Sequence, residues 1–166
     1  MTDAVDRVIA QWTAERPDLD LAAMATFGRL GRVAAHLTRA IEAVPAAHGL
    51  TLGEADVLWC LRRSGEPYTL TPSVLARTLL LSPAGTTNRI DRLEAAGLVE
   101  RRLDPDDRRS FLVRLTETGR EVADRAVANH VASEGRLLAP PSPPERRALD
   151  RALRTLLAAV EPDPGA

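Results

Sequence analysis

Two Ser/Thr-Pro pairs constrain the fold of this 166-residue chain more than any other feature. Thr71-Pro72 and Ser82-Pro83 each place a hydroxyl at a helix N-cap and a proline at the first helical position. A proline is well tolerated there because its missing N–H has no partner inside the helix. The pairs predict two short helices joined by a tight turn, the second ending at Gly97. This arrangement indicates a helix-turn-helix.

A β-hairpin is predicted directly after these helices. Strand-like runs at 98–103 and 111–115 flank the sequence DPDDRRS, whose residue types are typical of turns. Residues 101–114 hold five arginines and three aspartates, so this hairpin is locally basic in a chain with a formal net charge of −1. Two helices followed by a basic hairpin indicate a winged helix-turn-helix, whose second helix enters the DNA major groove.

The flanking segments are predicted to be amphipathic helices. Apolar residues recur at helical spacing over 20–44, 118–138 and 145–160, and the stripes that they form need a partner surface. Aromatic residues make up only 3% of the chain, so its core is expected to be aliphatic and to suit helix-on-helix packing. The expected fold class is mainly α with a small two-stranded β-wing: a winged helix-turn-helix dimerised through its N- and C-terminal helices.

The helix before the motif is expected to be buried on both sides. Thr51 and Glu54 have capping-box spacing, and apolar residues surround the helix that they open as far as Arg63. The expected organisation along the chain is an extra N-terminal helix (1–16), a dimerisation helix (20–50), the winged helix-turn-helix lobe (51–119), C-terminal dimerisation helices (120–161) and a disordered tail (162–166).

The second helix of the motif is predicted to read DNA with one face. At about 100° per residue, Ile90 and Leu93 share the side that packs, while small and polar residues face away. Small residues permit close approach, and Asn88 can make a bidentate contact to adenine. Arginines at the hairpin tip suit phosphates or the minor groove, or pair with the neighbouring aspartates. The predicted DNA-binding residues are Ser82, Ala84, Thr86, Thr87, Asn88, Arg92, Arg108 and Arg109.

Arg89 is predicted to point inward, because it lies within about 40° of the packing face of the same helix. A buried guanidinium needs an anion. Asp56, on the helix expected to be buried on both sides, is an available partner. Two interpretations remain open: a purely structural Asp56–Arg89 pair, or a site where an anionic ligand competes for Arg89.

The run RLEAAGLVERRLDPDDRRSFLVRLTETG resembles the signature of the MarR (multiple antibiotic resistance regulator) family. The matching residues are Leu93-Glu94, Gly97-Leu98-Val99, Asp107-Arg108-Arg109, Thr116 and Gly119. At Gly85-Thr86 the sequence departs from the Ser or Ala and aliphatic residue of many members. The resemblance implies an obligate homodimer that binds a near-palindromic operator in double-stranded DNA, with half-sites about one helical turn apart.

The chain also resembles the urate-responsive branch of that family. The features shared are an N-terminal helix with Trp12, the following ERPDLD, and Asp56 and Arg89. The resemblance implies that Trp12, Asp56 and Arg89 line a ligand pocket, with Ser64 where that branch has an amide side chain. Trp12 also suits a staple that holds its helix to the body. The expected effector is a small anionic molecule such as urate or a related aromatic, with a different phenolic ligand, or none, as alternatives.

Other classes of function find little support in the sequence. There is no Gly-rich phosphate loop and no Ser/His/Asp arrangement, so an enzyme is not expected, and a protein-interaction module would not need a basic wing. His36, His48 and His130 lack metal-ligand spacing, and neither a metal nor a cofactor is expected. Cys60 is interpreted as a buried apolar residue rather than a redox sensor. Without a signal peptide or membrane-length segment, a cytoplasmic ligand-responsive regulator, most simply a repressor, is predicted.

Overall fold

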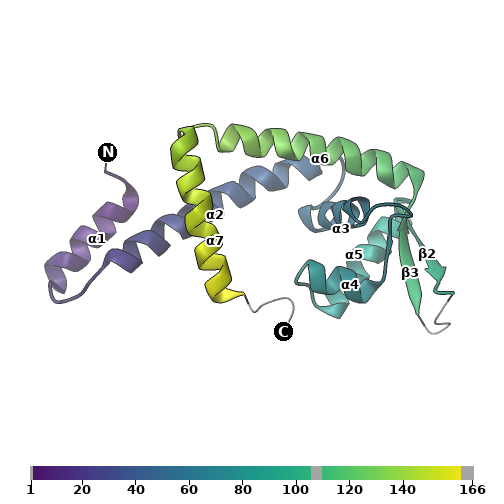
Figure 1. Ribbon diagram of the computed structural model, residues 1–166, viewed down its shortest axis with the longest axis horizontal. Helices are drawn as coiled ribbons and strands as arrows, with labels where there is room; N and C mark the ends of the chain where they lie inside the picture. The colour runs from purple at the N-terminus through teal and green to yellow at the C-terminus, as the bar shows by residue number, and fades with distance from the viewer. Residues whose placement is uncertain (1, 106–109, 162–166) are drawn as a thin grey trace.

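The computed structural model describes residues 2–105 and 110–161. Figure 1 shows a lobe of short helices and a small sheet at one end, with long helices running from it to the other end. The elements in chain order are α1 (Ala4–Glu15), α2 (Ala22–Ala46), α3 (Leu52–Arg63), β1 (Thr69–Leu70), α4 (Pro72–Thr78), α5 (Pro83–Ala95), β2 (Val99–Leu103), β3 (Phe111–Leu115), α6 (Glu117–Leu137) and α7 (Pro143–Val160).

The predicted helix-turn-helix is confirmed, and its ends are held as the sequence indicates. The Thr71 hydroxyl accepts a hydrogen bond from the Val74 N–H at the start of α4, and the Ser82 hydroxyl accepts one from the Gly85 N–H at the start of α5. Gly97 follows α5 with φ +70°, a conformation that glycine adopts without steric cost. Local capping chemistry therefore fixes where α5 begins and ends.

The wing has one strand more than predicted. The strands β2 and β3 form the expected antiparallel hairpin, with Arg101 opposite Val113. The short strand β1 pairs antiparallel with the other edge of β3, with Thr69 opposite Arg114, so the sheet order is β1-β3-β2. A two-residue strand is too short to show the alternation of apolar and polar residues by which strands are recognised. The wing is therefore fastened directly to the segment that precedes α4.

The core of the lobe surrounds α3. Both sides of this helix are buried, as its sequence predicts, and the Thr51–Glu54 capping box is present at its start. Aliphatic side chains from α3, α4, α5 and β3 form the centre of the core: Leu58, Leu61, Leu75, Ile90, Leu93 and Val113. Because α3 touches both α5 and α6, it connects α5, the second helix of the helix-turn-helix, mechanically to the long helices.

The helix α2 includes a proline. The apolar helical pattern of the sequence ends at residue 44, but the helix continues to Ala46 with Pro45 buried inside its last turn. Pro45 removes one helical hydrogen bond, and only Ala46 follows it within α2, so no long helical segment has to continue beyond the proline. The Pro45 carbonyl in turn accepts hydrogen bonds from the N–H groups of His48 and Leu50. These bonds tie the end of α2 to the start of α3.

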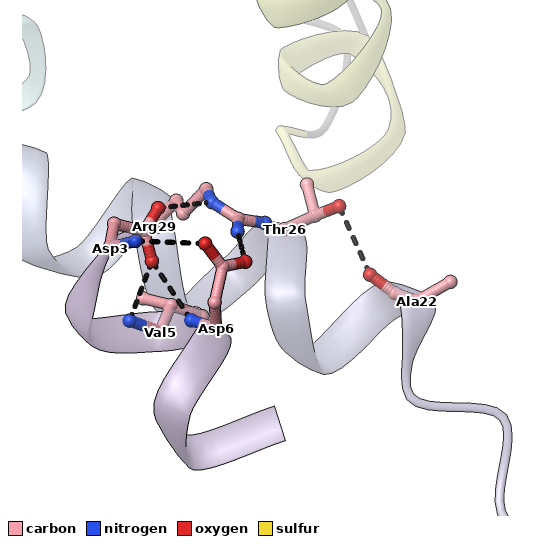
Figure 2. A network of polar contacts seen from close by, with 6 residues as sticks. All are labelled: Asp3, Val5, Asp6, Ala22, Thr26 and Arg29. Atoms are coloured by element: carbon pink, nitrogen blue, oxygen red, sulfur yellow. Dashed lines mark hydrogen bonds and ion pairs between the residues drawn. The ribbon is translucent and has the colours of Figure 1, made fainter. Parts of the chain in front are cut away.

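The extra helix α1 docks on α2 through one arginine, as Figure 2 shows. Asp3 and Asp6 form a reciprocal capping box at the start of α1, and the Arg29 guanidinium forms ion pairs with both carboxylates. This arginine lowers the pKa of the Asp3 carboxyl below its ordinary value. Beside it, Val5 packs where a side chain on Gly28 would lie. The docking of α1 is thus coupled to the folding of its first turn.

The helix α7 has no buried residue in the protomer, although its apolar stripe is continuous. Figure 1 shows α7 crossing α2, and a mainly apolar groove of about 410 Å³ lies between them. The residues that line this α2–α7 groove include Phe27, Leu30, Leu153, Leu156, Leu157 and Val160. Over the part of the chain that the structure describes, no helix is both long and apolar enough to span a membrane.

Candidate functional site

The recognition helix α5 presents the two faces predicted for it. Ile90 and Leu93 are buried, whereas Ala84, Thr87, Asn88 and Arg92 are exposed. These four and the exposed Ser82 at the N-cap make up the outward surface of α5, which runs from its N-cap to Arg92 in its last turn.

Thr86 does not belong to that outward surface, and the expectation that it contacts DNA is wrong. Its side chain is only 1% exposed, and its hydroxyl donates to the Ser82 carbonyl at 3.1 Å. The helical period places Thr86 one turn before Ile90 on the packing side. This explains the departure from the family pattern at this position, because a threonine that bonds its own helix can replace an aliphatic residue in the core.

The basic character of the wing is smaller than the sequence suggests. Arg101 is paired with Asp91 and Glu94 of α5, and its guanidinium carbon lies 5.1 Å from the centroid of the Phe111 ring. Arg102 is paired with Glu100 on its own strand. The local excess of arginine in the hairpin therefore does not leave these two guanidinium groups free, because their partners lie on α5 and on the same strand. The two tip arginines predicted to bind DNA, Arg108 and Arg109, lie outside the described residues.

Replacing Arg101 with methionine is expected to weaken operator binding by up to about tenfold without unfolding the lobe. The Arg101–Asp91–Glu94 clasp sets the position of the wing relative to α5, and two partly exposed ion pairs contribute on the order of 1 kcal/mol together. Methionine keeps an apolar stem against Phe111. Fluorescence anisotropy with operator DNA measures the affinity. Arg102→Met, which removes an ion pair without touching α5, is the control; an equal loss in both variants would contradict a positioning role.

A cavity of about 380 Å³ lies between α5, the start of α3 and the end of α2, and Asn88 is also part of its lining. Arg89 is half-buried there, as predicted, and its guanidinium covers Gly53 so closely that a Cβ on Gly53 would lie 2.6 Å from it. Arg92 also lines the cavity and approaches the buried Glu54 at 3.7 Å. The lining holds two guanidinium groups beside the first turn of α3 and one carboxylate, Glu42, and this excess of positive charge suits an anion.

The structure brings Asp56 near this cavity but does not pair it with Arg89. Both residues are described and no ion pair joins them, because Arg89 lies over Gly53, about one turn before Asp56 on α3. The structural Asp56–Arg89 pair is therefore not formed. Burial raises the pKa of the Asp56 carboxyl above its ordinary value, and the charge of Arg89 offsets this only in part.

The other two predicted ligand residues lie away from Arg89 within one protomer. Ser64 ends α3 at the opposite end from Gly53, and its hydroxyl donates to the Leu61 carbonyl at 2.7 Å. Trp12 is 44% exposed on α1, which Figure 1 places at the far end of the protomer from α5. A single protomer thus assembles only part of the predicted pocket.

Gly53 and Glu54 are absent from the residues predicted from sequence to form the site. A glycine within the first turn of a helix has low helix propensity, and this signal indicates that another group approaches the backbone closely. Glu54 has a visible role in the capping box, which conceals its second contact with Arg92.

Comparisons of sequence and structure with known proteins find relatives that share this fold. A sequence profile described as MarR family matches residues 48–110. The transcriptional regulator PecS of Dickeya dadantii is 39% identical over 95% of this chain and 92% of its own length. The crystal structure of AbsC, a MarR family regulator from Streptomyces coelicolor, has a TM-score of 0.77 with 28% identity, covering 86% of this chain and 96% of its own.

A third relative was crystallised with a ligand. A MarR family protein of Mycobacterium tuberculosis, in complex with p-aminosalicylic acid, is 34% identical with a TM-score of 0.60, covering 76% of this chain and 94% of its own. The extent of the match to PecS, the family profile and the winged-helix architecture together identify the chain as a member of the MarR family of transcriptional regulators.

Proposed function

We propose that this protein is a ligand-responsive repressor that binds a near-palindromic operator as a homodimer and is released by a small anionic aromatic molecule such as urate. The observation that carries this proposal is the Arg89 cavity, whose lining also includes Asn88 and Arg92, two of the exposed residues expected to face DNA. A ligand there acts on the reading helix directly, so effector and operator compete through one rigid element.

The charges in the cavity favour an anion as the effector. Arg89 has no ion pair with Asp56, and Arg92 makes only a long contact, at 3.7 Å, with Glu54. An anion bound between the two arginines would draw the Arg92 side chain away from the outward surface and push α5 away from α3. Displacement of α5 by even a fraction of a turn misplaces Asn88 relative to the base edges.

The aromatic part of the proposed effector rests on a relative and on the resemblance to the urate-responsive branch. The relative from Mycobacterium tuberculosis was crystallised with p-aminosalicylic acid, which is an aromatic carboxylate. Urate has the same combination of a flat ring and a negative charge. A planar anion matches the fork of donors that a guanidinium presents. Trp12 and Ser64 complete such a pocket only if the partner protomer or a closing motion brings them to it.

Arg89→Ala is expected to leave the dimer and its operator affinity intact while raising the urate concentration needed for release by at least tenfold. Loss of one guanidinium contact to an anion corresponds to about 1.5–3 kcal/mol. Fluorescence anisotropy on a palindromic fragment from upstream of the gene measures both quantities. Arg7→Ala, on the exposed side of α1, is the matched control. A normal urate response in Arg89→Ala overturns the assignment of Arg89, and equal affinity for scrambled DNA overturns the operator claim.

Gly53→Ala provides a second test in which no charge is removed. The added Cβ would lie 2.6 Å from the Arg89 guanidinium, whose flexible end can move away. We therefore expect release by urate to be impaired while the lobe remains folded. An unchanged response, together with an unchanged response in Arg89→Ala, excludes this cavity as the effector site.

A further inference from the structure

A second and larger cavity lies at the base of the wing. It has a volume of about 570 Å³, within the range of small-molecule sites, and is bounded by the wing strands, the start of α6 and the loop before β1. Its charged and aromatic lining includes Tyr68, Glu100, Arg102, Arg114, Glu117 and Arg120.

This wing-base cavity is separate from both surfaces of the recognition helix. Side chains alternate between the two faces of a strand, so Arg101 and Val113 face α5 while their neighbours Arg102 and Arg114 face the opposite way. The cavity therefore occupies the sheet face that is turned away from α5. An occupant contacts neither Asn88 nor the Arg89 cavity.

Arg114 and Glu66 are the charged lining residues without an ion pair to a described residue. Arg102 pairs with Glu100 and Arg120 pairs with Glu117, while Glu66 is exposed to solvent. Arg114 is half-buried, yet no ion pair between described residues reaches it. Glu100 lies opposite Arg114 across the β2–β3 pair but forms its ion pair with Arg102, so the Arg114 guanidinium can bind a further anion.

Tyr68 gives the cavity an aromatic wall. Its backbone has φ +58°, an uncommon conformation for a non-glycine residue, and the Arg62 guanidinium carbon lies 5.1 Å from the centroid of its ring. Its hydroxyl is 3.5 Å from Glu66, whose exposed carboxylate is solvated. The ring is thus held in place beside Arg102 of β2, Arg114 of β3 and Arg120 of α6.

We propose that the wing-base cavity binds a small oxyanion, a carboxylate or phosphate group, with Arg114 as its principal ligand. Arg102 and Arg120 also line the cavity and can turn from Glu100 and Glu117 toward the bound charge, as guanidinium groups readily bind oxyanions in pairs. Because Arg102 and Arg114 lie on the wing and Arg120 on α6, the anion bridges the wing to the long helices.

The chain contains a single tyrosine, which makes the test specific to this cavity. Protein labelled with 3-fluorotyrosine gives one fluorine resonance, from Tyr68, and can be titrated separately with inorganic phosphate and with benzoate. We expect a saturable shift of this resonance in the wild type, in Arg7→Gln and in Arg89→Gln. We expect no saturable shift in Arg114→Gln, and at least tenfold weaker binding in Arg114→Lys, which keeps the charge but loses the fork of donors.

Saturation with phosphate alone identifies a phosphate site, and saturation with benzoate alone identifies a carboxylate site; both outcomes support the proposal. The proposal is overturned if neither anion saturates the resonance of the wild type, or if Arg114→Gln responds like the wild type. Retention of the shift in Arg89→Gln shows that this site is distinct from the effector cavity. The proposal for one site can therefore be overturned while the proposal for the other stands.

Discussion

Replacing Gly119 with alanine is expected to destabilise the protein by at least ~3 kcal/mol, the upper end of the cost of overpacking. A Cβ at this position would lie 1.9 Å from the carbonyl oxygen of Leu98 and 2.8 Å from its carbonyl carbon. That carbonyl also accepts the Thr116 N–H at 3.1 Å, so it cannot swing aside without losing a backbone bond. The start of α6 and the entry to β2 would therefore have to separate.

Gly135→Ala is the matched control, because it makes the same change in the same helix. No atom of the described residues lies within 4 Å of a Cβ at Gly135, and alanine is preferred over glycine inside a helix by about 1 kcal/mol. Urea denaturation monitored by circular dichroism should therefore place the two variants on opposite sides of the wild type. A Gly119→Ala protein as stable as Gly135→Ala would mean that the strand and helix do not approach as described.

The same contacts explain part of the sequence signature that resembles the MarR family. The Thr116 hydroxyl accepts the Gly119 N–H at 2.9 Å and donates to the Gly97 carbonyl at 2.8 Å. One side chain thus caps α6 and fastens it to the end of the recognition helix. The spacing between Thr116 and Gly119 is therefore a requirement of packing, and it carries no information on the operator or the effector.

The parts of the fold that could be predicted from the sequence are those that local chemistry determines. The caps at Thr51, Thr71, Ser82 and Thr116 each act within three or four residues, so the starts of α3 to α6 follow from short sequence patterns. The hairpin was also predictable, because both strands are long enough to show their character. The strand β1 was not, because its identity depends on pairing with β3, far along the chain.

The site was harder to predict because its contacts join distant elements. The inward direction of Arg89 follows from the helical period, but its position over Gly53 depends on how α3 packs against α5. Arg101 belongs to a basic stretch in the sequence, and only the packing of the wing on α5 reveals its partners. Periodicity predicts the direction of a side chain, whereas its partner is decided by tertiary structure.

Phe27→Glu is expected to convert the protein from dimer to monomer, raising the dimer dissociation constant by at least about a hundredfold. Phe27 is 63% exposed in the protomer, where such a surface substitution changes stability by no more than about 0.5 kcal/mol. In the proposed homodimer the α2–α7 groove is covered by the second copy, and an unpaired carboxylate buried there costs roughly 3 kcal/mol or more. A cost of about 1.4 kcal/mol corresponds to each tenfold change in the dissociation constant.

Analytical ultracentrifugation over a range of concentrations distinguishes the two cases, and operator binding should weaken together with dimerisation. Leu103→Glu is the matched control, because Leu103 is 76% exposed on β2, far from the groove. It should remain dimeric. If Phe27→Glu and Leu103→Glu sediment alike as dimers, the exposed stripe of α7 faces solvent or another partner, and two-fold reading of the operator must depend on a different surface.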